Sequence, residues 1–193
     1  MPRIDHFSLL APFYDCLIHR REPEMLAAIA GLPVQGALLD AGGGTGRISK
    51  ALQGMATSVV VADISLAMLR QATSKNGLEV VCSQTEALPF TAASFARVVI
   101  VDAFHHVCDQ EKTAAELWRV LSPGGRIVIE EPDIRVWMVK LVAVLERLAF
   151  MRSAFRSPAN IAALFDFPGA EVDVQRQGYI AWIIVKKKEE THR

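Results

Sequence analysis

The sequence has few cysteines and no excess of charge of either sign. Cys16, Cys82 and Cys108 are far apart and form no C-x-x-C pair. An odd number of widely spaced cysteines favours buried thiols in a reducing compartment over disulfides or zinc ligands. Lysine plus arginine and aspartate plus glutamate both count 21, so no net charge draws the chain to nucleic acid. We therefore expect a cytoplasmic protein with no metal site and no nucleic-acid partner.

A secretory signal and a long apolar run are also missing. The start, MPRIDHF, has an acid at position 5 and no sustained apolar core. The most apolar segment, VWMVKLVAVLERLAFM, is interrupted by Lys140, Glu146 and Arg147 and falls short of the ~20 apolar residues of a spanning helix. With 193 residues, of which 51% are hydrophobic, the chain is long enough for one good-sized core. We expect a soluble protein with a single domain, 1–193.

Short apolar runs alternate with helical patterns from residue 37 to residue 130. The predicted strands are Ala37–Asp40, Val59–Ala62, Glu79–Cys82, Arg97–Val101 and Arg126–Glu130. The predicted helices between them are Arg47–Gly54, Ser65–Ser74 and Gln110–Leu121, the last ended by the breaker SPGG at 122–125. This alternation is typical of a parallel sheet with helices on both faces.

The pattern changes after the fifth strand. A long helix is predicted over Arg135–Phe155 and a shorter one over Pro158–Phe165, followed by the runs EVDVQR and YIAWIIVKK, which meet at Gly178. Two alternating runs around a glycine predict a hairpin that adds an antiparallel strand. The terminal KKKEETHR is predicted to be a solvated tail. The fold class is therefore α/β: a Rossmann-like doubly wound sheet, mostly parallel, with a C-terminal antiparallel hairpin strand.

A glycine-rich stretch, LLDAGGGTGRIS, follows the first predicted strand. A phosphate-binding P-loop would end in Gly-Lys-Ser/Thr, which is absent here. A dinucleotide fingerprint G-x-G-x-x-G would place its third glycine at Arg47, and starting from Gly43 fails because Thr45 stands at the second glycine. The pattern that is present is D-x-G-x-G-x-G, formed by Asp40, Gly42, Gly44 and Gly46.

The segment LLDAGGGTG resembles the first motif of class I S-adenosylmethionine-dependent methyltransferases. Further segments resemble later motifs of this class in the expected order: VVVADIS, TEALPF, FARVVIVDAFHHV and ELWRVLSPGGRIVIEEP. The resemblance covers about Phe7–Lys187 and is closest to the ubiquinone and menaquinone biosynthesis methyltransferases of type 11. It implies that S-adenosyl-L-methionine donates a methyl group to a small, hydrophobic acceptor, quinone-like or lipid-like, and leaves as S-adenosyl-L-homocysteine.

The resemblance also implies roles for the residues of the first two motifs. Asp40 would help to hold the methionine ammonium group. Gly42 and Gly44 would let the backbone approach the cofactor closely, beside the N–H groups that begin the next helix. Asp63, at the end of the second strand, would accept hydrogen bonds from both ribose hydroxyls. An alternative for Asp63 is a cap for the following helix, although Ser65 could serve that purpose as well.

Later positions are assigned to the adenine and to the methyl group. Ile64 and Met68 would pack on the adenine and ribose, although an apolar pair at this spacing is also common in a plain core. Relatives have an aspartate that binds the adenine amino group where this chain has Gln84, followed by Thr85; the amide oxygen of Gln84 can still accept. The remaining predicted cofactor residues are Tyr14, which would close over the site, and Asp102, at the exit of the fourth strand.

A catalytic residue is not identified from the sequence. His105 and His106 follow Asp102 at the edge where ligands of open α/β sheets bind, so either could serve as a base. The alternative is that one histidine is packed and hydrogen-bonded. The accepting atom and the oligomeric state also stay undetermined.

Two segments outside the central sheet have predicted roles. Residues 1–30 are expected to cover the cofactor, and residues 131–168 form a helical insertion that faces the substrate or acts as a lid. Within 135–156, five basic residues accompany one acid, Glu146. This part is either a buried helix that completes the core or a lid or peripheral membrane contact for a hydrophobic acceptor. Two other functions also stay open: a cofactor-binding protein without methyltransferase activity and a nicotinamide-dependent oxidoreductase.

Overall fold

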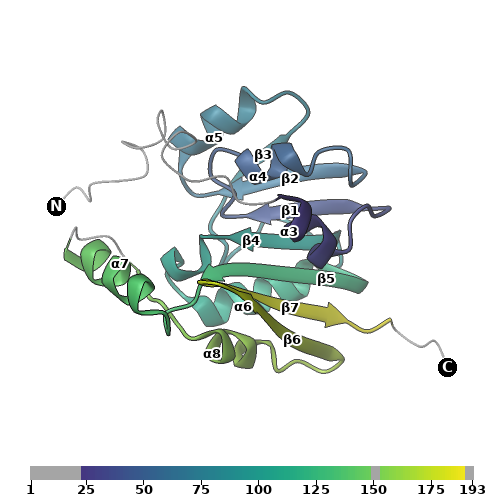
Figure 1. The fold of residues 1–193 in the computed structure, drawn as a ribbon. Helices are drawn as coiled ribbons and strands as arrows, with labels where there is room; N and C mark the ends of the chain where they lie inside the picture. The colour runs from purple at the N-terminus through teal and green to yellow at the C-terminus, as the bar shows by residue number, and fades with distance from the viewer. Residues whose placement is uncertain (1–22, 149–152, 190–193) are drawn as a thin grey trace.

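The predicted strands between residues 37 and 130 are present and run parallel to one another. The computed structural model describes residues 23–148 and 153–189, and within them a seven-stranded sheet has the order β3-β2-β1-β4-β5-β7-β6 (Figure 1). The strands are β1 (Ala37–Ala41), β2 (Ser58–Asp63), β3 (Glu79–Cys82), β4 (Phe95–Val101), β5 (Leu121–Pro132), β6 (Ala170–Gln177) and β7 (Ile180–Lys187). Because β1 pairs with both β2 and β4, the strand order reverses beside β1.

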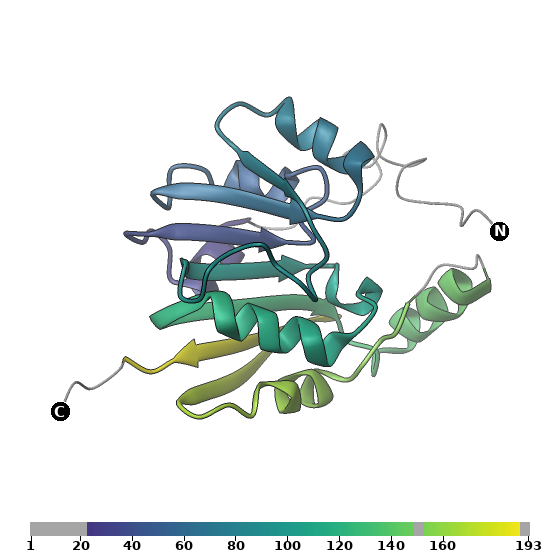
Figure 2. The same cartoon turned by 180° about the vertical axis from the view of Figure 1, so that it is seen from behind.

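Helices cover both faces of the sheet. They are α3 (Pro23–Ala30), α4 (Arg47–Ala51), α5 (Leu66–Thr73), η2 (Phe104–His106), α6 (Gln110–Val120), α7 (Trp137–Leu148), α8 (Pro158–Ala162) and η3 (Ala163–Phe165). The helices α3 and α4 lie on the face seen in Figure 1, and α6 and α8 lie on the face seen in Figure 2. Alternate strand residues divide between these layers: Val98 and Ile100 join the α6 layer, whereas Val99 joins the α3 layer.

The C-terminal hairpin confirms the predicted antiparallel strand. β7 runs antiparallel to both β5 and β6, and its residues Ala181 to Val185 are buried. The prediction of a solvated tail from Lys186 onward is wrong for Lys187. Its ammonium group donates to the carbonyls of Trp118 at 3.0 Å and Leu121 at 2.9 Å. Lys187 is the last residue of β7, and this hydrogen bonding places it beside the C-terminal end of α6.

Two predicted boundaries differ from the structure. The fifth strand was predicted to begin at Arg126, but β5 begins at Leu121, directly after α6 and before the SPGG breaker. Leu121 pairs with Phe95 on β4, and the register of this pairing shifts before Arg97. The predicted helix Arg135–Phe155 differs at both ends: α7 begins at Trp137 and is described as far as Leu148, and residues 153–155 are not helical. In that segment Ala154 N–H donates to the His105 carbonyl at 2.7 Å, and the Ala154 carbonyl accepts from Gln110 at 2.7 Å. Tertiary partners therefore replace the helical hydrogen bonds.

The segment before β1 divides into two parts. Residues 1–22 lie outside the described residues, so the predicted cofactor-covering role stays a prediction for them. Residues 23–30 form α3, which buries Leu26, Ala27 and Ala30 against the sheet and accepts a 2.7 Å hydrogen bond from Arg97 at the Ala30 carbonyl. Within residues 23–148 and 153–189, no helix is both long and apolar enough to cross a bilayer.

Candidate functional site

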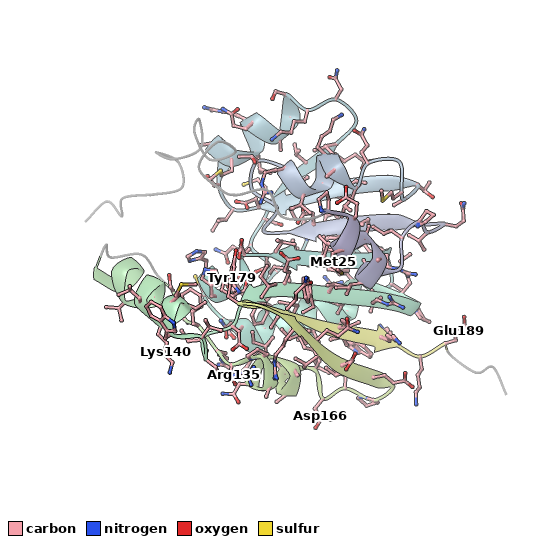
Figure 3. The ribbon with its side chains drawn as sticks, in the orientation of Figure 1. Met25, Arg135, Lys140, Asp166, Tyr179 and Glu189 are labelled. Carbon is pink, nitrogen blue, oxygen red and sulfur yellow. The ribbon has the colours of Figure 1, made fainter. Side chains whose placement is uncertain are left out.

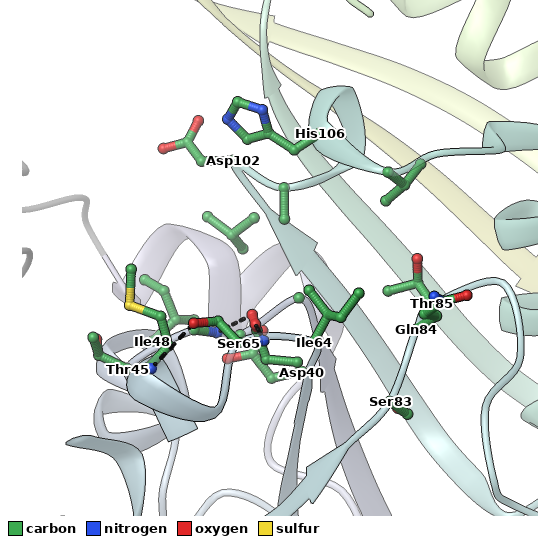
Figure 4. A pocket seen from close by; sticks show the side chains of 18 of the residues that line it. Asp40, Thr45, Ile48, Ile64, Ser65, Ser83, Gln84, Thr85, Asp102 and His106 are labelled. Carbon is green, nitrogen blue, oxygen red and sulfur yellow. Dashed lines mark hydrogen bonds between the residues drawn. The ribbon is translucent and has the colours of Figure 1, made fainter. Parts of the chain in front are cut away.

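A cavity opens where β1, β2 and β4 end and the turn after β3 begins, at the carboxyl edge of the parallel strands (Figure 4). We call it the carboxyl-edge cavity. The predicted cofactor residues that line it are Asp40, Gly42, Gly44, Asp63, Ile64, Met68, Gln84, Thr85 and Asp102. Tyr14, the remaining predicted residue, lies outside the described residues. The structure thus brings the described predicted residues together at the strand-order reversal, the usual ligand site of such sheets.

The glycine loop between β1 and α4 adopts a backbone that side chains disfavour. Gly42, Gly44 and Gly46 have φ values of 69°, 55° and 69°, in the left-handed region. A Cβ atom on Gly42 would lie 2.8 Å from the Cβ of Ala103, which follows β4. On Gly43 it would lie 2.6 Å from Cγ of Asp40. Glycine is therefore required both for the loop conformation and for the close packing of the loop on its neighbours.

Asp63 connects the end of β2 to this loop. Its Oδ2 accepts from Gly44 N–H at 2.9 Å, and its Oδ1 accepts from Ser65 N–H at 2.7 Å. The alternative role as a helix cap belongs instead to Ser65, whose hydroxyl accepts from Met68 N–H at 3.4 Å at the start of α5. Asp63 is therefore a carboxylate with a fixed orientation in the cavity wall.

Asp40 is a buried acid beside the same loop. Its side chain is 1% exposed, and the Ser49 hydroxyl donates to its Oδ2 at 2.7 Å. Burial raises the pKa of Asp40 from 3.8 to about 6; the Ser49 hydrogen bond opposes this rise, and the nearby charge of Asp63 adds to it. A cation in the cavity would therefore favour the ionised carboxylate.

The turn after β3 forms a second side of the cavity, where Figure 4 shows Ser83, Gln84 and Thr85. Thr85 is buried, and its hydroxyl lies 3.0 Å from that of Thr113 on α6. Glu86 Oε1 accepts from the backbone N–H groups of Cys108 at 2.7 Å and Asp109 at 3.0 Å. This carboxylate therefore fixes the rim segment that follows η2.

Asp102 and His106 lie near one another on a third side of the cavity (Figure 4). Asp102 has a φ of 51°, a conformation that non-glycine residues avoid and that often marks a functional position. His105 instead is buried: its Nδ1 lies 2.5 Å from Glu131 Oε2, and its ring stacks on Phe155 at 4.2 Å. One histidine is therefore packed, as the alternative foresaw, and the other lines the cavity.

Several lining residues were not predicted from the sequence as ligand contacts. They are Gly43, Thr45, Arg47, Ile48, Ser65, Ser83, Glu86, Val101, Ala103, Val107 and Cys108. Ser83 Oγ and Arg47 Nε are buried and have no hydrogen-bond partner among the described residues. The segment TEALPF, which contains Glu86, could have predicted that the turn after β3 lines the cavity. The contribution of Val107 and Cys108 could not be predicted, because it depends on the position of η2.

The geometry disfavours a dinucleotide in this cavity. Gly44 N–H already donates to Asp63 and so is not free to donate to a phosphate, and the carboxylate of Asp40 lies beside the same loop. A diphosphate here would face two carboxylates, which repel it. An uncharged or cationic ligand group fits this side of the cavity better.

Comparisons with known proteins agree with the motif order. The family model of the Methyltransferase domain matches residues 39–129. The chain is 36% identical over 141 residues to the demethylmenaquinone methyltransferase of Thermus thermophilus, a match that covers 65% of this chain and 63% of that protein. It is 32% identical over 142 residues to the ubiquinone/menaquinone biosynthesis C-methyltransferase UbiE of Hahella chejuensis, covering 65% of this chain and 57% of that protein. The match therefore spans only about three fifths of the length of either relative.

A solved structure extends the likeness to nearly the whole chain. It is described as a SAM-dependent methyltransferase from Thermotoga maritima and superposes with a TM-score of 0.78 at 23% sequence identity. The superposition covers 94% of this chain and 98% of that one. At this identity the likeness shows the fold alone.

Proposed function

We propose that this chain, which belongs to the class I S-adenosylmethionine-dependent methyltransferases, binds S-adenosylmethionine in the carboxyl-edge cavity and methylates a small, hydrophobic acceptor. The observation that carries the proposal is the pair of carboxylates, Asp40 and Asp63, beside a glycine loop with no side chains to fill the space.

The donor and acceptor groups of the cavity fit this cofactor. S-adenosylmethionine has a cationic ammonium group and two ribose hydroxyls, which are favourable partners for carboxylates. Ser83 Oγ and Arg47 Nε are buried without a partner among residues 23–148 and 153–189, and they would gain from a polar ligand or from water that accompanies it. The residues present therefore suit a ligand that is cationic at one end and polar along its length.

Each side of the cavity would hold one part of the cofactor. Asp63 would accept from the ribose hydroxyls, and Asp40 would face the methionine ammonium group. The Gln84 amide oxygen would accept from the adenine amino group, while Ile64 and Met68 would pack against the adenine and ribose. When bound, S-adenosylmethionine supplies an electrophilic methyl group on a sulfonium sulfur.

The chain itself contributes alignment and the exclusion of water. Well-oriented pairs of reacting groups can lower a barrier by roughly 7 to 11 kcal/mol, so a methyltransferase needs no nucleophile of its own. Asp102, held in its left-handed conformation directly after β4, fixes the part of the wall that continues into Ala103 and η2. If the accepting atom must lose a proton, His106 is the cavity side chain placed to receive it.

The proposed acceptor class follows from the apolar part of the cavity. Val101, Ala103 and Val107 line the cavity and have no assigned part of the cofactor to hold. The relatives from Thermus and Hahella have names that concern menaquinone or ubiquinone synthesis. A quinol-like or lipid-like acceptor fits both observations.

An acceptor screen tests this proposal. The protein is incubated with S-adenosylmethionine and a panel of a prenylated quinol, a simple phenol, a lipid and a small polar amine, and products are identified by mass spectrometry. We expect one added methyl group on a hydrophobic acceptor. Binding of S-adenosylhomocysteine without methyl transfer to any compound would instead favour a cofactor-binding protein without activity.

A further inference from the structure

Helix α7 presents its apolar side to solvent. Trp137, Met138, Leu141 and Val144 are 71%, 49%, 54% and 54% exposed. Their spacing of three and four residues, with Trp137 and Met138 adjacent, places them along one side of the helix. Val139, which points elsewhere, is 5% exposed. A surface helix normally buries its large apolar residues, so this set, which we call the α7 apolar face, is set up for contact with something outside the fold.

The α7 apolar face lies at the same edge of the sheet as the carboxyl-edge cavity. α7 follows the end of β5, and Figures 1 and 2 show it projecting away from the sheet at the carboxyl ends of the parallel strands. Tyr179, 48% exposed in the turn between β6 and β7, belongs to the same region, since its carbonyl accepts from Asp133 N–H at 2.7 Å. A partner on this face would therefore lie at the same edge of the sheet as the cavity mouth.

Cations accompany this apolar face. Lys140 on α7 is exposed, and so is Arg135, which lies two residues before the start of α7 (Figure 3). The carboxylate of Asp133 is paired with Arg135 and lies 3.8 Å from Arg176. Because two half-exposed guanidinium groups share one buried carboxylate, this cluster is net positive. A partner that matches this surface has apolar groups opposite the α7 apolar face and anionic groups opposite the cations beside it.

We propose that the α7 apolar face, together with Tyr179, docks on the surface of an anionic phospholipid bilayer. Exposed tryptophan and tyrosine favour the headgroup level, apolar side chains enter the acyl boundary, and lysine and arginine meet anionic headgroups. The link to catalysis rests on the proposed function: docking would bring the cavity mouth to the layer in which a hydrophobic acceptor dissolves.

Vesicle co-sedimentation tests the docking surface. The full-length protein is mixed with vesicles of phosphatidylcholine alone or of phosphatidylcholine with phosphatidylserine. We expect binding to the anionic vesicles, and at least about tenfold weaker binding for Val144→Glu, which puts a negative charge in the apolar face. The matched control is Val172→Glu on β6, which makes the same change at an exposed valine away from α7 and should bind like wild type.

A second pair of variants tests the charge. Lys140→Ala should weaken binding to anionic vesicles about fivefold, whereas Lys186→Ala, at the other end of the sheet, should leave it unchanged. Absence of wild-type binding to anionic vesicles overturns the proposal, as does equal binding of Val144→Glu and Val172→Glu. Self-association that Val144→Glu abolishes, without any vesicle binding, would instead assign this face to a second copy of the chain.

The outcome is separable from that of the proposed function. Calorimetry with S-adenosylhomocysteine needs no membrane, and Val144→Glu should bind it as wild type does, which also shows that the variant is folded. If vesicles bind but S-adenosylhomocysteine does not, the proposed function fails and the docking surface stands.

Discussion

Asp63 Oδ2 accepts a hydrogen bond from the backbone N–H of Gly44 at 2.9 Å. The bond joins the end of β2 to the loop after β1, two neighbouring strands whose carboxyl ends meet at the cavity. It fixes the orientation of the carboxylate before any ligand arrives, and a site arranged in advance loses less free energy on binding. The spacing between the glycines and Asp63 in the sequence therefore corresponds to one helix and one strand, which return the chain to the neighbouring strand end.

Substituting Gly42 tests the close packing of the loop. Gly42→Ala and Gly54→Ala both put a side chain on a left-handed residue, at φ 69° and 85°. Only the first meets an obstacle, the Ala103 Cβ at 2.8 Å, whereas nothing lies within 4 Å at Gly54. We expect Gly42→Ala to lower the free energy of unfolding by about 1–3 kcal/mol more than Gly54→Ala. Equal urea midpoints for the two variants would contradict the packing of the loop on the β4 exit.

The affinity for S-adenosylhomocysteine should depend on pH through Asp40. Burial raises the pKa of Asp40 to about 6, so the carboxyl is mostly neutral at pH 5 and ionised at pH 7.5. Because a ligand ammonium group favours the ionised form, we expect binding to be about tenfold tighter at pH 7.5 than at pH 5. Calorimetry at both pH values measures this, with Asp40→Asn as the variant in which the difference should disappear. A wild-type affinity that does not change with pH would remove Asp40 from ammonium binding.

The stability of the protein without ligand should show the opposite pH trend. A raised pKa in the folded state stabilises the fold below pH 3.8, and this contribution is lost as pH rises through about 6. Asp40→Asn carries no charge at any pH, and its amide oxygen can still accept from Ser49. Relative to wild type, Asp40→Asn should gain about 2–3 kcal/mol of unfolding free energy between pH 4 and pH 7.5. A constant difference between the two proteins across this range would show that Asp40 is not destabilised by burial.

Glu131 should matter for stability because it serves two groups of the η2 turn. Its Oε1 accepts from Phe104 N–H at 2.9 Å and its Oε2 contacts His105 Nδ1 at 2.5 Å, all within the buried interior. Glu131→Ala leaves both without this partner and should cost about 2–5 kcal/mol. Urea unfolding against the exposed control Glu79→Ala measures the effect. A cost below about 0.5 kcal/mol, the usual limit for exposed sites, would mean that the turn is held by other contacts.

The strands and the glycine loop could be predicted from the sequence because their signals are local. Apolar runs of strand length, the SPGG breaker after the third helix and the acid ahead of the glycines are all properties of neighbouring residues. The boundaries that differed depend on distant partners. Leu121 joins β5 by pairing with Phe95, and Ala154 leaves the helical pattern for partners on η2 and α6.

The sequence could not predict which side chains face solvent, the core or the cavity. The apolar residues of α7 predict a helix, but which side of it faces solvent depends on where the chain leaves β5. The FHHV segment likewise has two adjacent histidines that the sequence cannot distinguish. Glu131, buried at the end of β5, pairs with His105 and leaves His106 to line the cavity.

The assignment of the carboxyl-edge cavity is tested by calorimetry of S-adenosylhomocysteine with wild type, Asp63→Ala and the control Asp109→Ala. Asp63 and Asp109 both accept backbone N–H groups beside a helix start, but only Asp63 lines the cavity. Loss of a charged acceptor should weaken binding by about 1.5–3 kcal/mol in Asp63→Ala, with Asp109→Ala equal to wild type. Absence of binding to wild type, or equal binding by wild type and Asp63→Ala, would contradict the assignment.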